Sequence, residues 1–232
     1  MAAGQSASSD DLGIGKLLVA AKDLPDPNFA KSVVLLIQYD QHGAVGLMIN
    51  HRSDVPISRI LEGVDTAKRS SDPLYLGGPV EMQSVFALVK SQKKLDDATS
   101  VLGDVYAVST KTALEKGFAA SSGASDLRVY LGYCGWGEGQ LENEIRQGGW
   151  WIFEAKAGTV FDPNPSSLWP RLIVRTEQQV AQARGTGSAG SRAVMAPQLW
   201  VQMPSMVASN QELTIAIRQR LSRGPVLTAF SN

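Results

Sequence analysis

Residues 132–142 read GYCGWGEGQLE, a stretch in which three glycines alternate with a tryptophan and a glutamate. The residues before it, 127–133, form an apolar and aromatic run of strand length, which predicts a β-strand. The residues after it, 140–147, place apolar side chains at helical spacing in front of two glycines, which favour the end of a helix. The stretch therefore predicts a strand, a tight glycine-rich loop at 135–139, and a helix.

Short apolar runs elsewhere in the chain predict further strands, most of them joined by turns too short to contain a crossover helix. Such connections favour an α+β fold with a mostly antiparallel sheet over a doubly wound parallel sheet. The predicted strands are 14–22, 32–39, 44–50, 74–76, 85–90, 105–109 and 150–154, and the predicted helices are 57–62, 111–118 and 165–173.

Length and composition indicate a single domain. The chain has 232 residues, of which 44% are hydrophobic and 19% charged, enough to bury one sizeable core. We expect a flexible N-terminus at 1–12, one α+β domain at 13–175, and a linker with a basic C-terminal extension at 176–232. No apolar run approaches the roughly 18 residues of a membrane-spanning helix, so no membrane association is expected.

The N-terminus and the cysteine content predict a cytoplasmic location. The first eleven residues lack the basic start and apolar stretch of a signal peptide. Cys134 is the only cysteine, which excludes a scaffold held by intrachain disulfides and fits a reducing compartment.

The C-terminal part of the chain is basic although the net charge of the whole is zero. From Arg171 onward the sequence contains seven arginines and two glutamates, and residues 209–223 have the spacing of a basic helix. Nucleic-acid binding through this tail is therefore an alternative function. A G-x-G-x-x-G match at 185–190 follows a polar segment and not a strand, so we interpret it as a linker.

Few residues could bind a metal or act as a nucleophile. His42, His51 and Cys134 have no partners at the spacing of a metal site, so the sequence predicts no metal and no cofactor. Cys134 as a nucleophile would need a base such as His51 beside it, which makes a thiol-dependent enzyme a further alternative. Burial at the end of a strand is the favoured interpretation, because free cysteines are usually buried.

Three carboxylates lie near the start of the predicted helix after the glycines, with Glu138 just before it and Glu142 and Glu144 within it. Leu141, Glu144 and Ile145 lie at helical spacing on one face. Glu138 and Glu142 could form an acid–base pair, but negative charge at a helix N-terminus is ordinary and that interpretation is preferred.

Glycines beside a large aromatic residue allow a ligand to approach the backbone closely. For Trp136 we favour packing in the core over ligand binding, and for Gly77-Gly78 a turn over a binding concavity. The residues proposed for ligand binding are Asn28, Asn50, Gly77, Gly78, Trp136, Gln140 and Glu142.

Four motifs occur in order: DPNF at 26–29, GAVGLMIN at 43–50, LGGPV at 76–80, and GYCGWGEGQLE at 132–142. Over about residues 14–173 the chain resembles the AlgH (YqgE-like) family. The resemblance implies a coiled, partly folded-over sheet flanked by helices. Family members are often described as transcriptional regulators, and the resemblance brings no catalytic residues and no DNA-binding helix-turn-helix.

Together these observations predict a non-enzymatic regulatory or ligand-binding protein whose partner is a small molecule or another protein. Binding of DNA by the tail and thiol-dependent catalysis at Cys134 are the two alternatives.

Overall fold

A computed structural model describes residues 11–61 and 63–184, in which ten strands form one sheet. The strands are β1 (Lys16–Ala20), β2 (Val33–Asp40), β3 (Gly43–Met48), β4 (Arg52–Pro56), β5 (Pro73–Leu76), β6 (Val80–Lys90), β7 (Thr99–Leu102), β8 (Val105–Val108), β9 (Leu127–Gly137) and β10 (Trp150–Glu154). Their order is β10-β1-β2-β3-β9-β6-β8-β7, and β5 pairs with β4 and β9. All of these pairs are antiparallel except β5 with β9.

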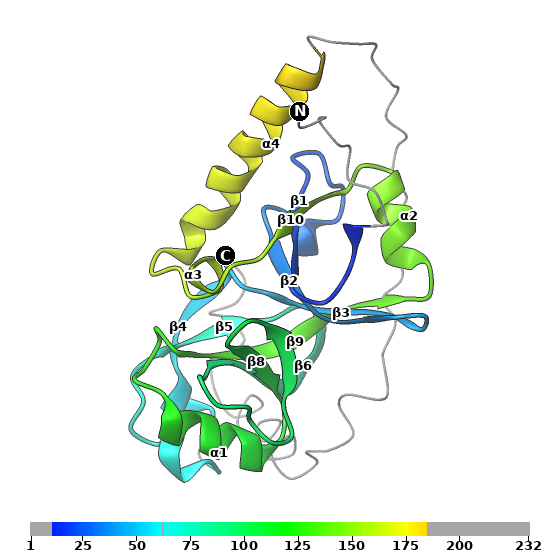
Figure 1. The fold of residues 1–232 in the computed structure, drawn as a ribbon. Helices are drawn as coiled ribbons and strands as arrows, with labels where there is room; N and C mark the ends of the chain where they lie inside the picture. The colour runs from blue at the N-terminus through cyan, green and yellow to red at the C-terminus, as the bar shows by residue number, and fades with distance from the viewer. Residues whose placement is uncertain (1–10, 62, 185–232) are drawn as a thin grey trace.

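Four α-helices and four single-turn 3-10 helices accompany the sheet (Figure 1). The α-helices are α1 (Lys111–Ala120), α2 (Gln140–Arg146), α3 (Ala157–Val160) and α4 (Leu168–Arg184). The 3-10 helices are η2 (Pro27–Phe29), η3 (Ile57–Arg59), η4 (Asp65–Ala67) and η5 (Pro165–Ser167). The Thr110 side chain accepts a hydrogen bond from Ala113 N and so caps the start of α1, a position where threonine is preferred.

The sheet folds over because β9 belongs to both of its halves. Residues 127–131 of β9 pair with β5 and β6, Tyr133 also pairs with β6, and residues 134–137 pair with β3. Gly132, with φ of 68°, lies at the change of partner. A Cβ placed on Gly15, which precedes β1, would lie 2.6 Å from the carbonyl oxygen of Val101 in β7, so the last strand of the sheet approaches the start of β1.

Both faces of the sheet are covered. Val33, Leu35 and Ile37 of β2 face an inner core enclosed by the folded sheet, and Val34 and Leu36 face an outer core. A strand buried on both faces needs apolar residues at consecutive positions, which explains the continuous run in β2. A third core lies between the β6–β9 side of the sheet and α1.

The structure confirms the predicted α+β, single-domain fold and corrects several elements. The predicted helix at 57–62 is one 3-10 turn, because Gly63 follows closely and Val64 is already extended. The predicted loop at 135–139 is strand as far as Gly137, which pairs with Gly43 of β3. Strands β4 and β7, which are rich in polar residues, were not predicted.

The last described helix is longer than expected. A 3-10 turn at Pro165–Ser167 leads into α4, which continues to Arg184, past residue 176 where the linker is predicted to begin. The G-x-G-x-x-G match, the predicted basic helix at 209–223 and most of the predicted flexible N-terminus lie outside the described residues. No helix within the described ranges is long and apolar enough to cross a membrane.

Candidate functional site

Gly77 and Gly78 lie directly against β9 where it changes partner. A Cβ on Gly77 would overlap the carbonyl oxygen of Gly132, and a Cβ on Gly78 would overlap the backbone of Tyr133. The Gly77 N–H donates to Leu131 O at 2.7 Å. Both glycines are therefore required for the close approach of two backbone segments. They occupy buried positions and do not form a concavity open to solvent.

Cys134 packs beneath the same crossing. Its side chain is fully buried, and its thiol donates to the carbonyl oxygen of Gly77 at 3.3 Å. That oxygen also accepts the Met48 N–H at 2.8 Å. Burial raises the pKa of the Cys134 thiol well above its usual value, which favours the unreactive protonated form. The predicted burial of Cys134 is confirmed, but β9 continues past it to Gly137, so the residue does not lie at a strand end.

Trp136 is fully buried on β9, which confirms the preferred interpretation of this residue as part of the core. Gly46 on the neighbouring strand lies beside the indole, but a Cβ there is excluded by Val34, whose Cγ1 would lie only 2.4 Å away. The indole packs against Phe29, with ring centroids 6.1 Å apart, and against Trp150 at 6.0 Å. The three rings form one aromatic cluster in the outer core.

A buried carboxylate binds this cluster together. Glu144 accepts hydrogen bonds from Trp136 Nε1 at 3.0 Å, from Trp150 Nε1 at 2.8 Å and from Gln140 Nε2 at 3.1 Å. Burial raises the pKa of Glu144, and the hydrogen bonds from the two indoles and the amide oppose that rise. The sequence places Glu144 on the apolar face of the helix, but its two indole partners come from strands.

The other predicted residues of α2 also have structural partners. Gln140 Oε1 accepts the Gly137 N–H at 3.1 Å and so connects the end of β9 to the helix. Glu142 accepts the hydroxyl of Tyr39 at 2.6 Å, joining α2 to β2. Both side chains are half-buried.

Residues 26–31 form an exposed turn held against the aromatic cluster. Asp26 accepts the Asn28 N–H at 2.9 Å, and the Phe29 ring is inserted beside Trp150, with centroids 5.5 Å apart. Asn28 itself is exposed, as is Lys31, which has φ of 59°. One buried side chain thus anchors a turn whose polar residues face solvent.

Asn50 holds the end of this turn. Its Oδ1 accepts the Val33 N–H at 2.8 Å, and its Nδ2 donates to the carbonyl oxygen of Lys31 at 2.9 Å. Beside it, the hydroxyl of Ser32 and Nε2 of His51 are hydrogen-bonded at 3.0 Å. Burial lowers the pKa of His51, so its neutral form is favoured. These contacts fix the backbone where the turn enters β2.

Comparison with known proteins decides the family. A sequence model described as AlgH-like matches residues 17–181, more than half of the chain. The chain belongs to the AlgH-like family. A UPF0301 protein of Myxococcus xanthus is 38% identical over 160 residues, covering 68% of this chain and 87% of the relative. A UPF0301 protein of Streptomyces avermitilis is 34% identical over 173 residues, covering 72% of this chain and 88% of the relative.

Two solved structures also resemble this AlgH-like chain. The crystal structure of a protein from Corynebacterium diphtheriae has a TM-score of 0.60 and 27% identity, covering 71% of this chain and 87% of that protein. The solution structure of the AlgH protein from Pseudomonas aeruginosa has a TM-score of 0.56 and 27% identity, covering 76% and 94%. The resemblance inferred from the four sequence motifs is confirmed.

The seven predicted ligand-binding residues of this AlgH-like chain do not occupy equivalent environments. Asn50, Gly77, Gly78 and Trp136 are buried, Gln140 and Glu142 are half-buried, and Asn28 is exposed. The structure brings the Asn28 turn next to Trp136 through Phe29, and it places the two glycines at the strand crossing. Ligand binding by this set stays a prediction, and Asn28 has the most accessible side chain.

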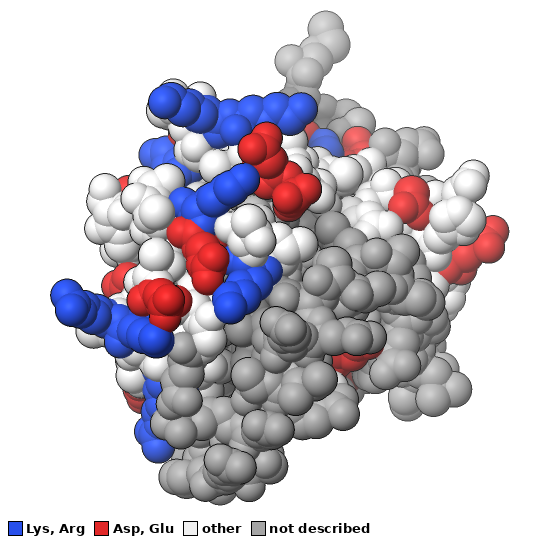
Figure 2. Space-filling model, turned by 90° about the horizontal axis from the view of Figure 1, so that it is seen from below, with Lys and Arg blue, Asp and Glu red and all other residues white. Residues whose placement is uncertain are grey.

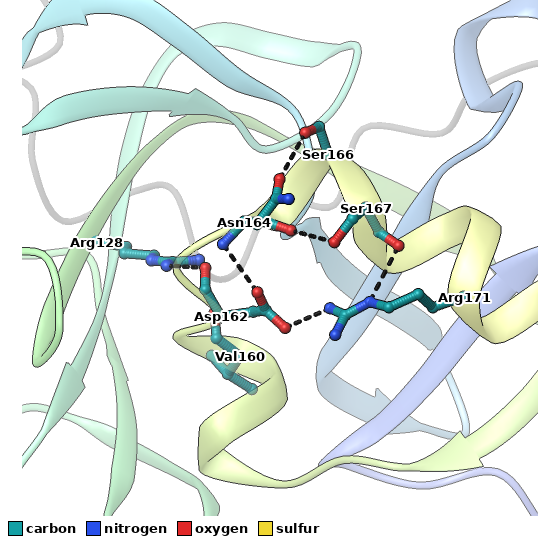
Figure 3. Close-up of polar contacts among 7 residues, drawn as sticks. All are labelled: Arg128, Val160, Asp162, Asn164, Ser166, Ser167 and Arg171. Carbon is teal, nitrogen blue, oxygen red and sulfur yellow. Dashed lines mark hydrogen bonds and ion pairs between the residues drawn. The ribbon is translucent and has the colours of Figure 1, made fainter.

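Sequence reasoning missed a cluster around Arg128 that fixes the α3–η5 connection to the sheet (Figure 3). The buried Arg128 guanidinium donates to Val160 O at 3.0 Å and to Asp162 O at 2.5 Å. It lies 5.0 Å from the centroid of the Tyr75 ring. The Asp162 carboxylate forms an ion pair with Arg171 of α4. The only sequence signal was an arginine inside an apolar strand.

Charge on the described surface is mixed. Figure 2 shows basic and acidic residues lying side by side on one face, without a continuous basic stripe among the coloured residues. Ion pairs at the surface include Lys68 with Asp65 and Lys116 with Asp96. The described residues contain no group of three or more His, Cys, Asp or Glu that could hold a metal ion.

Proposed function

We propose that this chain is a non-enzymatic regulatory protein that acts by binding a partner through the exposed turn 26–31. The observation that carries the proposal is the combination of exposure and anchoring in this turn. Asn28 and Lys31 face solvent, while Phe29 between them is buried against two tryptophans.

A turn held in this way favours binding on energetic grounds. Ordering a flexible loop on association costs about 0.5–1.5 kcal/mol for each immobilised side chain, in addition to its backbone entropy. Asp26 and Asn50 already fix the backbone on both sides of Asn28 through three hydrogen bonds. The exposed amide and ammonium groups are thus presented without the backbone part of that ordering cost.

The burial and hydrogen bonding of the potentially reactive side chains support a role other than catalysis. Cys134 is buried with a raised pKa, Glu144 accepts three hydrogen bonds, and His51 is paired with Ser32. Each of these groups stabilises the fold around the turn. The proposal includes the cytoplasmic location and the absence of a cofactor that the sequence predicts.

Affinity purification with paired variants tests this proposal. Tagged wild-type chain is compared with the double variant Asn28→Ala, Lys31→Ala, and with Lys93→Ala, Lys94→Ala as a control on another exposed segment. We expect a bound protein or metabolite that is lost from the turn variant and retained by the control. Identical bound molecules in all three samples, or none in any, would contradict the proposal.

Nucleic-acid binding through the arginine-rich tail is the second proposal, supported by the seven arginines from Arg171 onward. Deletion of residues 185–232 leaves α4 intact and removes most of these arginines. If the tail binds DNA, retention of the full chain on DNA is salt-sensitive and the truncated chain is not retained. Equal retention of both chains would reject the tail as the binding element.

A further inference from the structure

Strand β10 ends the sheet with one edge unpaired among the described residues. It pairs with β1 from Trp150 opposite Ala20 to Glu154 opposite Lys16. Just beyond the two ends of the strand, the Ala21 N–H donates to Gly149 O and the Ala155 N–H donates to Gly15 O.

In an antiparallel ladder, hydrogen-bonded and non-hydrogen-bonded pairs alternate, so these two bonds determine which residues of β10 bond to β1. Residues 151 and 153 bond to β1, and residues 150, 152 and 154 direct their N–H and C=O groups away from it. No other strand in residues 11–61 and 63–184 pairs with these outward groups.

Apart from its length of five residues and the Arg175 guanidinium over the Phe153 ring, the edge lacks the features that usually prevent strand pairing. Its register with β1 contains no bulge, and residues 150–153 include no proline and no charge. Trp151, Ile152 and Phe153 are each half-exposed, so apolar surface flanks the edge on both faces of the sheet. Glu154, the single charge in the strand, is paired with Lys16.

We propose that β10 pairs with β10 of a second copy of this chain, antiparallel about a two-fold axis at Ile152. Ile152 then lies opposite Ile152 of the partner subunit, and Trp150 lies opposite Glu154 of the partner subunit. Because the outward residues are spaced symmetrically about position 152, this register satisfies all outward N–H and C=O groups in both copies.

The geometry also sets the strength of the pairing. Two five-residue strands bury less than the roughly 1,200 Å² of a stable complex, so the dimer is weak and forms with increasing protein concentration. The Phe29 ring packs against Trp150 at the start of β10, so the dimer presents two copies of turn 26–31 near one axis. Paired turns would increase avidity for a divalent partner, although the dimer does not depend on the proposed function.

Sedimentation equilibrium of the full chain, followed up to roughly 1 mM, measures this association. We expect a monomer–dimer equilibrium for the wild-type chain. The variant Ile152→Lys places two like charges opposite each other on the axis and is expected to weaken association by about tenfold or more. Ser100→Lys on β7, the strand at the other end of the sheet, is the matched control and should leave the equilibrium unchanged. A monomer at every concentration, or a dimer insensitive to Ile152→Lys, would overturn the proposal.

Hydrogen exchange of the wild-type chain provides a test that does not rely on a folded variant. The amides of Trp151 and Phe153 bond to β1 and should be protected at every concentration. The amides of Ile152 and Glu154 should gain protection only as the dimer forms. Protection of these two amides that is independent of concentration would also overturn the proposal.

Discussion

Two regions of the molecule contain the motifs that resemble the family, and they differ in what the motif residues contact. At the strand crossing, Gly77, Gly78 and Trp136 are buried and contact only the fold itself. In the turn 26–31, Phe29 is buried but Asn28 faces solvent. The contrast shows that the residues of a family motif can be ones that the packing of the fold requires, without a role in binding. The proposed binding chemistry is assigned to the few motif residues that the packing leaves exposed.

The largest effect is expected at the strand crossing. A Cβ on Gly77 overlaps the backbone of Gly132, and the backbone cannot move aside as a flexible side chain could. We therefore expect Gly77→Ala to destabilise the fold by more than about 4 kcal/mol, measured by urea unfolding. Gly63→Ala is the control, because no atom lies within 4 Å of a Cβ there. Similar stability of both variants would show that the strand crossing does not require glycine at position 77.

An intermediate effect is expected where the two regions meet. Asn50→Ala leaves the Val33 N–H and the Lys31 carbonyl without their partner. The loss of both hydrogen bonds, one of them to the buried Val33 N–H, predicts a destabilisation of about 2 kcal/mol and faster hydrogen exchange in residues 28–33. Asn143→Ala is a suitable control because no side-chain hydrogen bond of Asn143 occurs among the described residues. Unchanged exchange in the turn would show that Asn50 does not hold it.

The raised pKa of Glu144 predicts that the stability of the fold depends on pH. Its pKa is raised in the folded chain, so the folded chain binds the proton more tightly than the unfolded chain does. The free energy of unfolding should therefore fall as pH rises from about 4.3, the value of an unperturbed glutamate, to the raised pKa of the folded state.

Urea unfolding across this pH range compares the wild-type chain with Glu144→Gln, which cannot titrate. As pH rises, the free energy of unfolding of the wild type should decrease relative to that of Glu144→Gln. Parallel pH profiles would mean that burial of Glu144 has no net effect on its titration.

The smallest effect on stability is expected for Asn28→Ala. The side chain is exposed, and its backbone N–H, which the substitution keeps, makes the hydrogen bond to Asp26. Stability should change by no more than about 0.5 kcal/mol, while binding of the partner is lost. A large loss of stability in thermal unfolding would assign Asn28 to the scaffold.

Local patterns in the sequence predict the elements that local physics determines. The apolar run from Val33 gives β2, and Thr110 caps α1 as its residue type suggests. The polar residues of β4, such as Arg52 and Asp54, do not have the apolar pattern of a strand. The segment is extended because it pairs with β5. Strand content of this kind depends on pairing more than on propensity.

The contacts of the candidate site could not be predicted in the same way. Glu144 meets Trp136 and Trp150 only because β9, α2 and β10 assemble around it. The sequence identified Trp136 and Gly77 as special without showing that a second backbone or ring occupies the space beside them. These close contacts form between segments that are distant in the sequence, so the spacing of residues along the chain does not predict them.

Backbone order parameters from ¹⁵N relaxation of the free protein test the central claim most directly. If the buried cluster holds the turn, residues 28–31 should have order parameters of about 0.85, the value of a rigid backbone, although all of them except Phe29 are exposed. Values below about 0.6 in the turn, with rigid neighbours in β1 and β2, would contradict a preformed binding turn.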